Sequence, residues 1–413
     1  MGGNDTNIHR YLKTFRGGRQ GEEQHTDIRE VLCEGSMFPQ YVNEFWTSRQ
    51  RAGSSLHEVP YRACFKSQLP AFFIKLLTSP GECVYDPFSG RGTTVIEAGL
   101  LDRVVISNDA NPLSTILTRP RFFIPPEKKI RERLSHITRE YPGQLEKDLS
   151  MFYHPETESE VAALRDYLKE RKDSEKEDEI DSWIRMVATT RLTGHSKGFF
   201  SVYTLPPNQA VSCERQKMIN ARKCQVPEYR DTQRLILKKS QSLVRDLDYA
   251  ARNSLLRAGK GGMFLNNDAR ATPDIGEGTV ALTVTSPPFL DVVQYSHDNW
   301  LRCWFNGLDA EEISRQLTMA RSVTGWAIVM KSVFQELYRV TKEKGWIAFE
   351  VGEVRKGTIA LDEVAIPAGA KAGFSCKGVL VNKQTFSKTS HIWGIGNNNL
   401  GTNSNRVVLF RKE

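Results

Sequence analysis

The chain has 413 residues, 39% hydrophobic and 26% charged, which is ordinary for a folded protein of two or three domains and excludes a disordered chain. No apolar run approaches the roughly 18 residues of a membrane-spanning helix, and the polar N-terminus lacks the apolar core of a secretion signal. Seven scattered cysteines form no C-x-x-C pair, so neither a disulfide framework nor any metal ligand is predicted. We therefore expect a cytoplasmic protein.

The charge is distributed unevenly along the chain. Lysine and arginine number 57 against 49 acidic residues, a net charge of +8. Residues 141–190 carry 7 basic and 13 acidic side chains (net −6), whereas residues 191–260 carry 14 basic and 5 acidic side chains (net +9). A segregated basic block indicates a polyanionic partner, most often nucleic acid. A solvated helical surface is the alternative.

The first elements in chain order are an arm and a helix. Residues 1–50 are polar and glycine-containing, and we expect an irregular arm with one short helix around residues 37–46. An apolar helical pattern follows at residues 69–77 and is stopped by Ser79-Pro80-Gly81.

A strand–turn–helix–strand unit comes next. Residues 83–86 form a short apolar strand, a glycine-rich turn leads into a helix at residues 95–100, and residues 103–107 form a second strand. This order is typical of a βαβ unit in a parallel sheet.

The alternation of strands and helices then stops for more than a hundred residues. The stretch from 127 to 262 is charged and helical, including residues 158–180 and 232–256, and is far too long for a loop. We interpret it as an inserted helical domain between two parts of one α/β domain, residues 51–126 and 263–413. The second part contains strands at 263–265, 280–285 and 346–351, a helix at 327–341, and a C-terminal hairpin of 378–385 with 406–409.

The turn after the first strand reads DPFSGRGTT, from Asp86 to Thr94. Glycines at the carboxyl end of a strand allow a ligand to approach the backbone, and the following helix presents free N–H groups. The turn lacks the lysine of a phosphate-binding loop and the third glycine of the dinucleotide motif, which disfavours ATP and NAD. Asp109 ends the second strand, where a carboxylate can accept both hydroxyls of an adenosine ribose.

The strand at 280–285 runs into Ser286-Pro287-Pro288-Phe289. The two prolines fix the backbone and remove two N–H donors, leaving carbonyl groups that only accept hydrogen bonds. Together with the Ser286 hydroxyl they suit an exocyclic amine, and Phe289 offers a face on which an extruded base can stack. In isolation, the same residues are a strand terminator beside a core phenylalanine.

With DPFSGRGTT and TSPPF together, the chain resembles the S-adenosylmethionine-dependent amino-methyltransferases of DNA over roughly residues 55–120 and 263–413. The resemblance implies a Rossmann-like sheet, mostly parallel with a C-terminal antiparallel hairpin, and an amine held by the tetrapeptide at 286–289. It also implies a helix on the cofactor side at residues 57–77. Its cofactor-binding candidates are Asp86, Phe88, Gly90, Gly92, Thr93, Asp109 and Asp268, the last for the adenine amine.

The target implied by the resemblance is a flipped base in double-stranded DNA. The SPP form is typical of the enzymes that methylate N4 of cytosine. N6 of adenine is the alternative, and a DNA-binding module that has lost catalysis is the alternative of a different class. A cognate restriction endonuclease is a candidate partner. For contact with DNA we single out Lys197, Asn208, Arg222, Lys223 and Trp393, in or near the insert and in the polar loop of the C-terminal hairpin.

Overall fold

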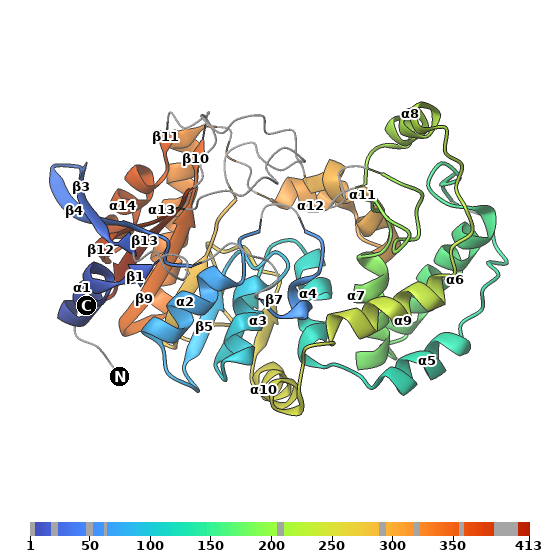
Figure 1. Cartoon of the computed structure of the whole chain (residues 1–413), viewed down its shortest axis with the longest axis horizontal. Coiled ribbons are helices and arrows are strands. Elements are labelled where there is room, and N and C mark those ends of the chain that lie inside the picture. The colour runs from blue at the N-terminus through green and yellow to red at the C-terminus, as the bar shows by residue number, and fades with distance from the viewer. Residues whose placement is uncertain are drawn as a thin grey trace.

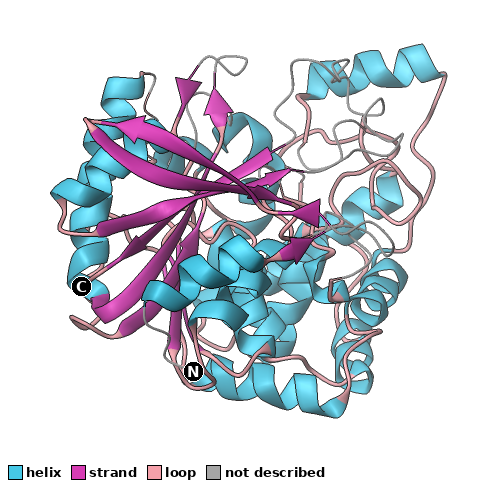
Figure 2. Ribbon diagram, turned by 60° about the vertical axis from the view of Figure 1, so that its left-hand side comes forward, coloured by secondary structure: helices cyan, strands magenta, loops and turns pink. Residues whose placement is uncertain are grey.

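The structure is a computed structural model, and it describes residues 5–17, 24–46, 53–61, 64–144, 146–204, 210–288, 295–317, 320, 322–354, 359–383 and 404–413. A large twisted sheet with helices on both faces forms one part of the molecule (Figure 2). A group of helices, α5 to α9, lies beside it (Figure 1). Among the described residues, no helix is both long and apolar enough to cross a membrane.

The main sheet has nine strands in the order β3-β4-β12-β13-β9-β8-β5-β6-β7. Strands β9, β8, β5, β6 and β7 are mutually parallel, while β13 is antiparallel to both β9 and β12. This arrangement confirms the predicted Rossmann-like sheet with an antiparallel C-terminal hairpin. In chain order the strands are β3 (Asp27–Cys33), β4 (Ser36–Asn43), β5 (Cys83–Asp86), β6 (Val104–Asn108), β7 (Met263–Leu265), β8 (Val280–Thr285), β9 (Thr341–Val351), β12 (Ser375–Lys383) and β13 (Ser404–Arg411).

Two short antiparallel ribbons accompany the main sheet. They pair β1 (Arg16–Gly17) with β2 (Gln24–His25), and β10 (Glu353–Val354) with β11 (Ile359–Ala360).

Helices cover both faces of the sheet because alternate residues of its strands are apolar on opposite sides. In β5, Val84 faces a core that includes α1 (Asp5–Thr14), α2 (Gln68–Leu77), α3 (Thr93–Leu100) and α10 (Tyr249–Lys260). The next residue, Tyr85, faces the core made with α13 (Val323–Val340) and α14 (Asp362–Lys371). The predicted helices at 69–77 and 327–341 correspond to α2 and α13.

The helical part has a hydrophobic core of its own, centred on Trp183, Phe152 and Phe200, which are all fully buried. Its helices are α5 (Glu127–Ser135), α6 (Pro155–Asp173), α7 (Glu179–Thr189), α8 (Cys213–Lys223) and α9 (Thr232–Leu243). Helix α11 (Tyr295–Asn306), the next helix after β8, also contributes Leu301 and Phe305 to this core. Four shorter elements complete the described chain: η2 (Ser55–His57), α4 (Leu113–Thr118), η3 (Arg119–Phe122) and α12 (Ala310–Gln316).

Two boundaries differ from the predictions. Helix α10 falls within the predicted insert of 127–262, but it packs against α3 and β6, so this helix covers the sheet. Asp248 caps its N-terminus and interrupts the single helix predicted over 232–256. We therefore propose that the inserted domain consists mainly of α5 to α9 and that α10 belongs to the α/β domain.

The N-terminal region is also more ordered than predicted. Residues 27–43 form the hairpin β3–β4, not an irregular arm with a helix at 37–46. Strand β4 pairs in parallel with β12, so a strand from the far end of the chain stabilises it. Glu34 and Gly35 adopt positive φ angles of 44° and 80° in the turn, which is the geometry of a tight two-residue hairpin loop.

Candidate active site

The site lies at the carboxyl ends of β5, β6, β7 and β8, where the order of the sheet reverses between β5 and β8. In open α/β sheets, ligands bind in the crevice at this reversal because the loops on either side diverge there. The polar residues predicted for cofactor and amine binding follow these four strands. The topology therefore brings the two sequence motifs, nearly 200 residues apart, to neighbouring strands.

The glycine-rich loop after β5 needs glycine at two positions. Gly90 has φ +52° and Gly92 has φ +76°, both in the left-handed region that other residues rarely adopt. A Cβ on Gly92 would lie 2.4 Å from Cγ2 of Thr118, and a Cβ on Gly90 would lie 3.2 Å from the ring of Tyr61. Both glycines are therefore required by the fold of the loop itself, besides any requirement of a ligand.

Asp86 is held inside the protein beneath this loop. It is 1% exposed, and its Oδ1 accepts hydrogen bonds from the Phe88 N–H (3.1 Å) and from Oγ1 of Thr285 (2.6 Å). Burial raises its pKa to about 7 despite these donors. Its carboxylate therefore joins two loops of the site, and contact of Asp86 with the cofactor stays a prediction.

Asp109 reaches the glycine-rich loop, while its predicted contact with the ribose stays a prediction. Its Oδ2 accepts a hydrogen bond from the Gly90 N–H (2.8 Å), and its Oδ1 accepts one from the Asn111 N–H (2.9 Å). Burial raises the pKa of Asp109 to about 6, while the two backbone donors favour the ionised form. Each carboxylate oxygen retains a further lone pair, so the group can accept two more hydrogen bonds.

The other two cofactor candidates next to the glycines have different surroundings. Phe88 is half-buried and packs against the core on the α13 side of the sheet. Thr93, the first residue of α3, is buried, and its hydroxyl accepts a hydrogen bond from Nε of Arg91 (3.1 Å). Thr93 is thus engaged by the loop itself.

Asp268 lies in the loop after β7, beside the same edge of the sheet. Its carboxylate forms an ion pair with Arg270 (2.5 Å), and this hydrogen bond lowers the pKa of Asp268. The loop is joined to β6 by Asn108, whose side-chain Oδ1 accepts from the Asn267 N–H (2.9 Å) and whose Nδ2 donates to the Asn267 carbonyl (2.9 Å). Asp268 thus follows one of the four strands and has Arg270 as a partner, and its contact with the adenine amine stays a prediction.

The amine-holding motif begins where β8 ends. Thr285 is fully buried, Ser286 is half-buried and Pro287 is buried. The carbonyl of Pro288 accepts a hydrogen bond from the indole N–H of Trp326 on α13 (3.0 Å). Phe289, the predicted stacking residue, lies outside the described residues.

Sequence reasoning missed the residues that hold these loops together. Asn108 is fully buried and also donates to the Pro87 carbonyl (3.3 Å), so it joins three strand ends. Arg121 donates to the carbonyls of Leu56 and Arg91 and is fully buried. The sequence did offer a signal for Asn108, because it is a polar residue at the end of an apolar strand, directly before Asp109. It offered none for Arg121, whose partners come close only in the folded chain.

The helix predicted on the cofactor side at residues 57–77 is wrong in extent, because the structure has η2 at Ser55–His57 and begins α2 only at Gln68. Arg91 donates to the carbonyls of His57 (3.0 Å) and Val59 (3.1 Å), and buried His57 forms a hydrogen bond with Glu97 of α3 (2.6 Å). Desolvation lowers the pKa of His57, which favours its neutral form. These contacts fix His57 and Val59, at the end of η2 and just after it, against the loop and α3.

Two of the five candidates for DNA contact lie on α8. Arg222 and Lys223 are exposed in its last turn, and the ammonium of Lys223 lies 4.2 Å from the ring centre of Tyr203. Lys197 is exposed in the loop after α7, while Asn208 and Trp393 lie outside the described residues. In Figure 1, α8 stands at the upper edge of the molecule, the same edge at which β9 continues into β10.

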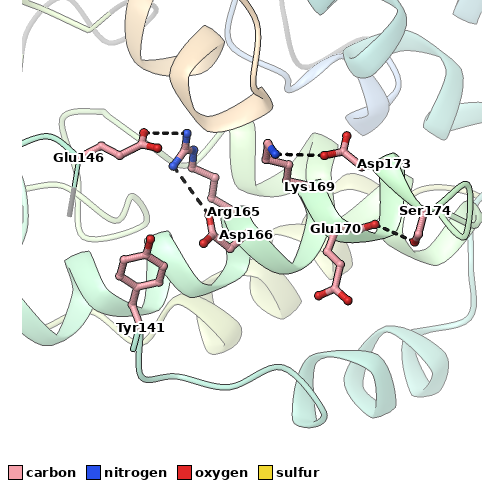
Figure 3. A pocket seen from close by; sticks show the side chains of 8 residues that line it. All are labelled: Tyr141, Glu146, Arg165, Asp166, Lys169, Glu170, Asp173 and Ser174. Atoms are coloured by element: carbon pink, nitrogen blue, oxygen red, sulfur yellow. Dashed lines mark hydrogen bonds and ion pairs between the residues drawn. The ribbon is translucent and has the colours of Figure 1, made fainter. Parts of the chain in front are cut away.

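A hollow of about 630 Å³ lies elsewhere, along α6 of the helical part (Figure 3). Its charged groups are largely paired with one another, as in Arg165–Glu146 (3.0 Å) and Lys169–Asp173 (3.0 Å). All its lining residues lie between 141 and 174, so it shares none with the site. Among the described residues, no group of three or more histidine, cysteine or acidic side chains is arranged to hold a metal ion.

Comparison with known proteins finds a similarity to DNA methylases. A family model described as DNA methylase matches residues 16–114, which include the glycine-rich loop and Asp109. The chain is related to the DNA amino-methyltransferases. This family uses S-adenosylmethionine and comprises enzymes that methylate N6 of adenine or N4 of cytosine.

One curated relative is the Type II methyltransferase M.BsoBI of Geobacillus stearothermophilus, 23% identical over 304 residues. The match covers 65% of this chain and 55% of the relative, so the chain spans about half the length of that protein.

Two solved methyltransferases are similar to the chain only loosely. TrmN from Thermus thermophilus is 12% identical with a TM-score of 0.32, covering 89% of this chain and 53% of TrmN. A TehB-like S-adenosylmethionine-dependent methyltransferase from Corynebacterium glutamicum is 7% identical with a TM-score of 0.30, covering 83% and 87%. Superpositions this loose carry no argument about substrate.

The residues of the site suit S-adenosylmethionine. The glycine-rich loop has no side chain at Gly90 or Gly92 to block a ligand from its backbone, and Asp109 has free lone pairs beside it. Asp109 would accept the ribose hydroxyls, and Asp268 would accept from the adenine amine.

Proposed function

We propose that this protein is a DNA methyltransferase that transfers a methyl group from S-adenosylmethionine to an exocyclic base amine, with N4 of cytosine as the preferred target. The main observation behind this proposal is the direct hydrogen bond from Thr285 to Asp86. Thr285 is next to the amine-holding motif, and Asp86 is next to the glycine-rich loop. This hydrogen bond supports the proposal because methyl transfer needs the acceptor amine and the methyl donor in one place.

The chemistry assigned to the protein is orientation. When bound, S-adenosylmethionine would supply an electrophilic methyl group and keep the electron pair of the broken S–CH3 bond as a neutral thioether, while the methylated amine loses one proton to solvent. The Ser286 hydroxyl and the Pro287 carbonyl accept hydrogen bonds from the amine, which draws its nitrogen toward tetrahedral geometry and localises the lone pair that forms the new N–C bond. Phe289 stacks on the flipped base. No covalent intermediate with the protein is required.

The choice of cytosine rests on Ser286. A neutral hydroxyl with a backbone carbonyl can orient the electron-poor amine of cytosine without help from a carboxylate. Adenine has an amine of similar geometry, so N6 of adenine is the second outcome that the experiment below distinguishes.

DNA is assigned to the side of the site on which α8 stands. Arg215, Lys217, Arg222 and Lys223 give this helix a basic exposed surface, and phosphate contacts by such residues supply most non-specific DNA affinity. Lys197 is exposed in the loop after α7 and is a further predicted DNA contact, as are Asn208 and Trp393, which lie outside the described residues. The relative M.BsoBI is a Type II methyltransferase, which supports a cytoplasmic role beside a cognate restriction endonuclease.

The test is methylation of DNA by the purified protein, followed by digestion to nucleosides and mass spectrometry. N4-methylcytosine is the expected product, and N6-methyladenine as the sole product would replace the cytosine assignment. Cofactor binding and DNA binding without any methylated base would favour a DNA-binding module that has lost catalysis.

A serine variant then tests the assigned chemistry. Ser286→Ala should lower the single-turnover rate of methyl transfer far more than DNA affinity, because its hydrogen bond matters most in the transition state. Ser135→Ala is the matched control, since Ser135 is exposed at the end of α5. A normal transfer rate in Ser286→Ala would contradict the role of the hydroxyl.

A further inference from the structure

The motif that holds the amine is fixed at its first end by a buried hydrogen bond. Thr285, the last residue of β8, is fully buried and donates from Oγ1 to Oδ1 of Asp86 at 2.6 Å. The same carboxylate oxygen accepts the Phe88 N–H at 3.1 Å, within the glycine-rich loop. One acceptor atom therefore connects the strand end before Ser286 to the loop assigned to the cofactor.

A second buried hydrogen bond fixes the other end of the motif. The indole N–H of Trp326 donates to the carbonyl of Pro288 at 3.0 Å. Trp326 is 2% exposed and belongs to the core between α13 and the sheet, so its ring cannot follow a moving loop without disturbing that core.

Between these two contacts the backbone has little freedom. Pro287 and Pro288 each have a fixed φ angle and no N–H with which to form an alternative hydrogen bond. Ser286 and the Pro287 carbonyl, the two groups assigned to the amine, therefore lie on a short segment that is anchored on both sides.

We propose that Thr285 and Trp326 are positioning residues, which hold Ser286 and the Pro287 carbonyl in their amine-accepting geometry before a base arrives. This role rests on the proposed function. It has a kinetic meaning, because a displacement of about 1 Å in a group that orients a reacting atom costs roughly a hundredfold in rate. The hydrogen bonds from Thr285 and Phe88 to Asp86 hold the amine-accepting groups at a fixed position relative to the cofactor loop.

The chain offers matched variants for the test. Thr285→Val keeps the shape of the side chain and removes the hydroxyl, whereas Thr285→Ser keeps the hydroxyl. Thr283→Val is the control on the same strand, because the Thr283 hydroxyl is also buried but has no hydrogen-bond partner among the described residues. Trp326→Phe removes the indole N–H, and Trp183→Phe is its control, because Trp183 donates a buried hydrogen bond to Ser240 (2.9 Å) in the helical part.

Single-turnover methyl transfer is measured at saturating cofactor and DNA, together with the dissociation constants of both. We expect Thr285→Val and Trp326→Phe to lower the rate about tenfold or more, while both dissociation constants stay within about twofold of wild type. Thr285→Ser should restore the rate, and the two controls should transfer methyl at the wild-type rate per folded molecule.

Equal rates in Thr283→Val and Thr285→Val would overturn the positioning role of the Thr285 hydroxyl, and a wild-type rate in Trp326→Phe would overturn that of Trp326. If Trp326→Phe fails to fold, the three threonine variants decide the matter alone. A wild-type protein that methylates no DNA would refute the proposed function and this role with it, whereas an active wild type with an unimpaired Thr285→Val would refute only the role.

Discussion

Asp109→Asn should remove a pH dependence of cofactor binding that the surroundings of this carboxylate create. Burial raises the pKa of Asp109 to about 6, so its carboxyl group is mostly protonated at pH 5 and mostly ionised at pH 7. Only the ionised form can accept hydrogen bonds on both oxygens while also accepting the N–H groups of Gly90 and Asn111. If that form binds the ribose, the dissociation constant should be about tenfold higher at pH 5 than at pH 7.

In the asparagine variant this change should disappear. An amide cannot accept on both sides, so its NH2 group must face one of the two backbone donors, and the affinity at pH 7 should fall by about 1–3 kcal/mol. Titration calorimetry with S-adenosylmethionine between pH 5 and pH 7.5 measures both effects.

The comparison with wild type isolates Asp109 from other groups. Asp86, whose pKa is raised to about 7, titrates in both proteins, and so does the cofactor itself. A difference between the two pH profiles therefore reports on the charge of Asp109, including its effect in raising the pKa of Asp86. Parallel profiles, or an unchanged affinity at pH 7, would refute the assignment of Asp109 to the ribose.

Two further predictions concern the loop and the basic helix. Gly92→Ala places a side chain on a left-handed backbone and against Thr118, so it should lower the free energy of unfolding by about 2–5 kcal/mol. Gly35→Ala is the control, because Gly35 has φ +80° but open space around it, and it should lose only about 1–2 kcal/mol. Chemical denaturation measures both losses, and equal losses would mean that the contact with Thr118 relaxes at no cost. Changing both Arg222 and Lys223 to alanine should weaken binding to all DNA sequences and reduce the slope of log K against log salt by about one to two. Lys169→Ala on α6 is the control and should leave the slope unchanged. An unaltered slope in the double variant would place the DNA on another surface.

The local sequence pattern was enough to predict features that lie within one strand or directly at its end. The order strand, glycine turn, helix, strand and Asp109 predicted a parallel sheet, because the carboxyl ends of adjacent parallel strands meet at one edge. Two apolar stretches, 378–385 and 406–409, predicted the C-terminal hairpin, which the structure has as β12 and β13. Each strand, turn and helix of these units carries its own apolar or glycine pattern within a short stretch of sequence, which is why the pattern predicted it.

The pattern misled where stability comes from a distant partner. Strand β3 is mostly exposed and charged, so it shows no strong periodicity, and the hairpin β3–β4 depends on β12, more than 300 residues later. Helix α10 has the composition of the insert, but it covers the sheet because Leu255 and Ala258 pack with α3. Propensity and charge do not distinguish a helix on the sheet from one in the insert.

The sequence by itself determined which residue types stand at the strand ends: two glycines that permit a close backbone approach, an acid after β6 and a Ser-Pro-Pro acceptor after β8. Only the tertiary structure decided their partners. Asp86 is next to the glycine-rich loop in sequence, yet its carboxylate binds Thr285, 199 residues away, and Trp326 holds the carbonyl of Pro288 from another helix. The physical reason is that a buried polar atom must find a hydrogen-bond partner in space, and the crossing of the chain between β5 and β8 brings that partner within reach.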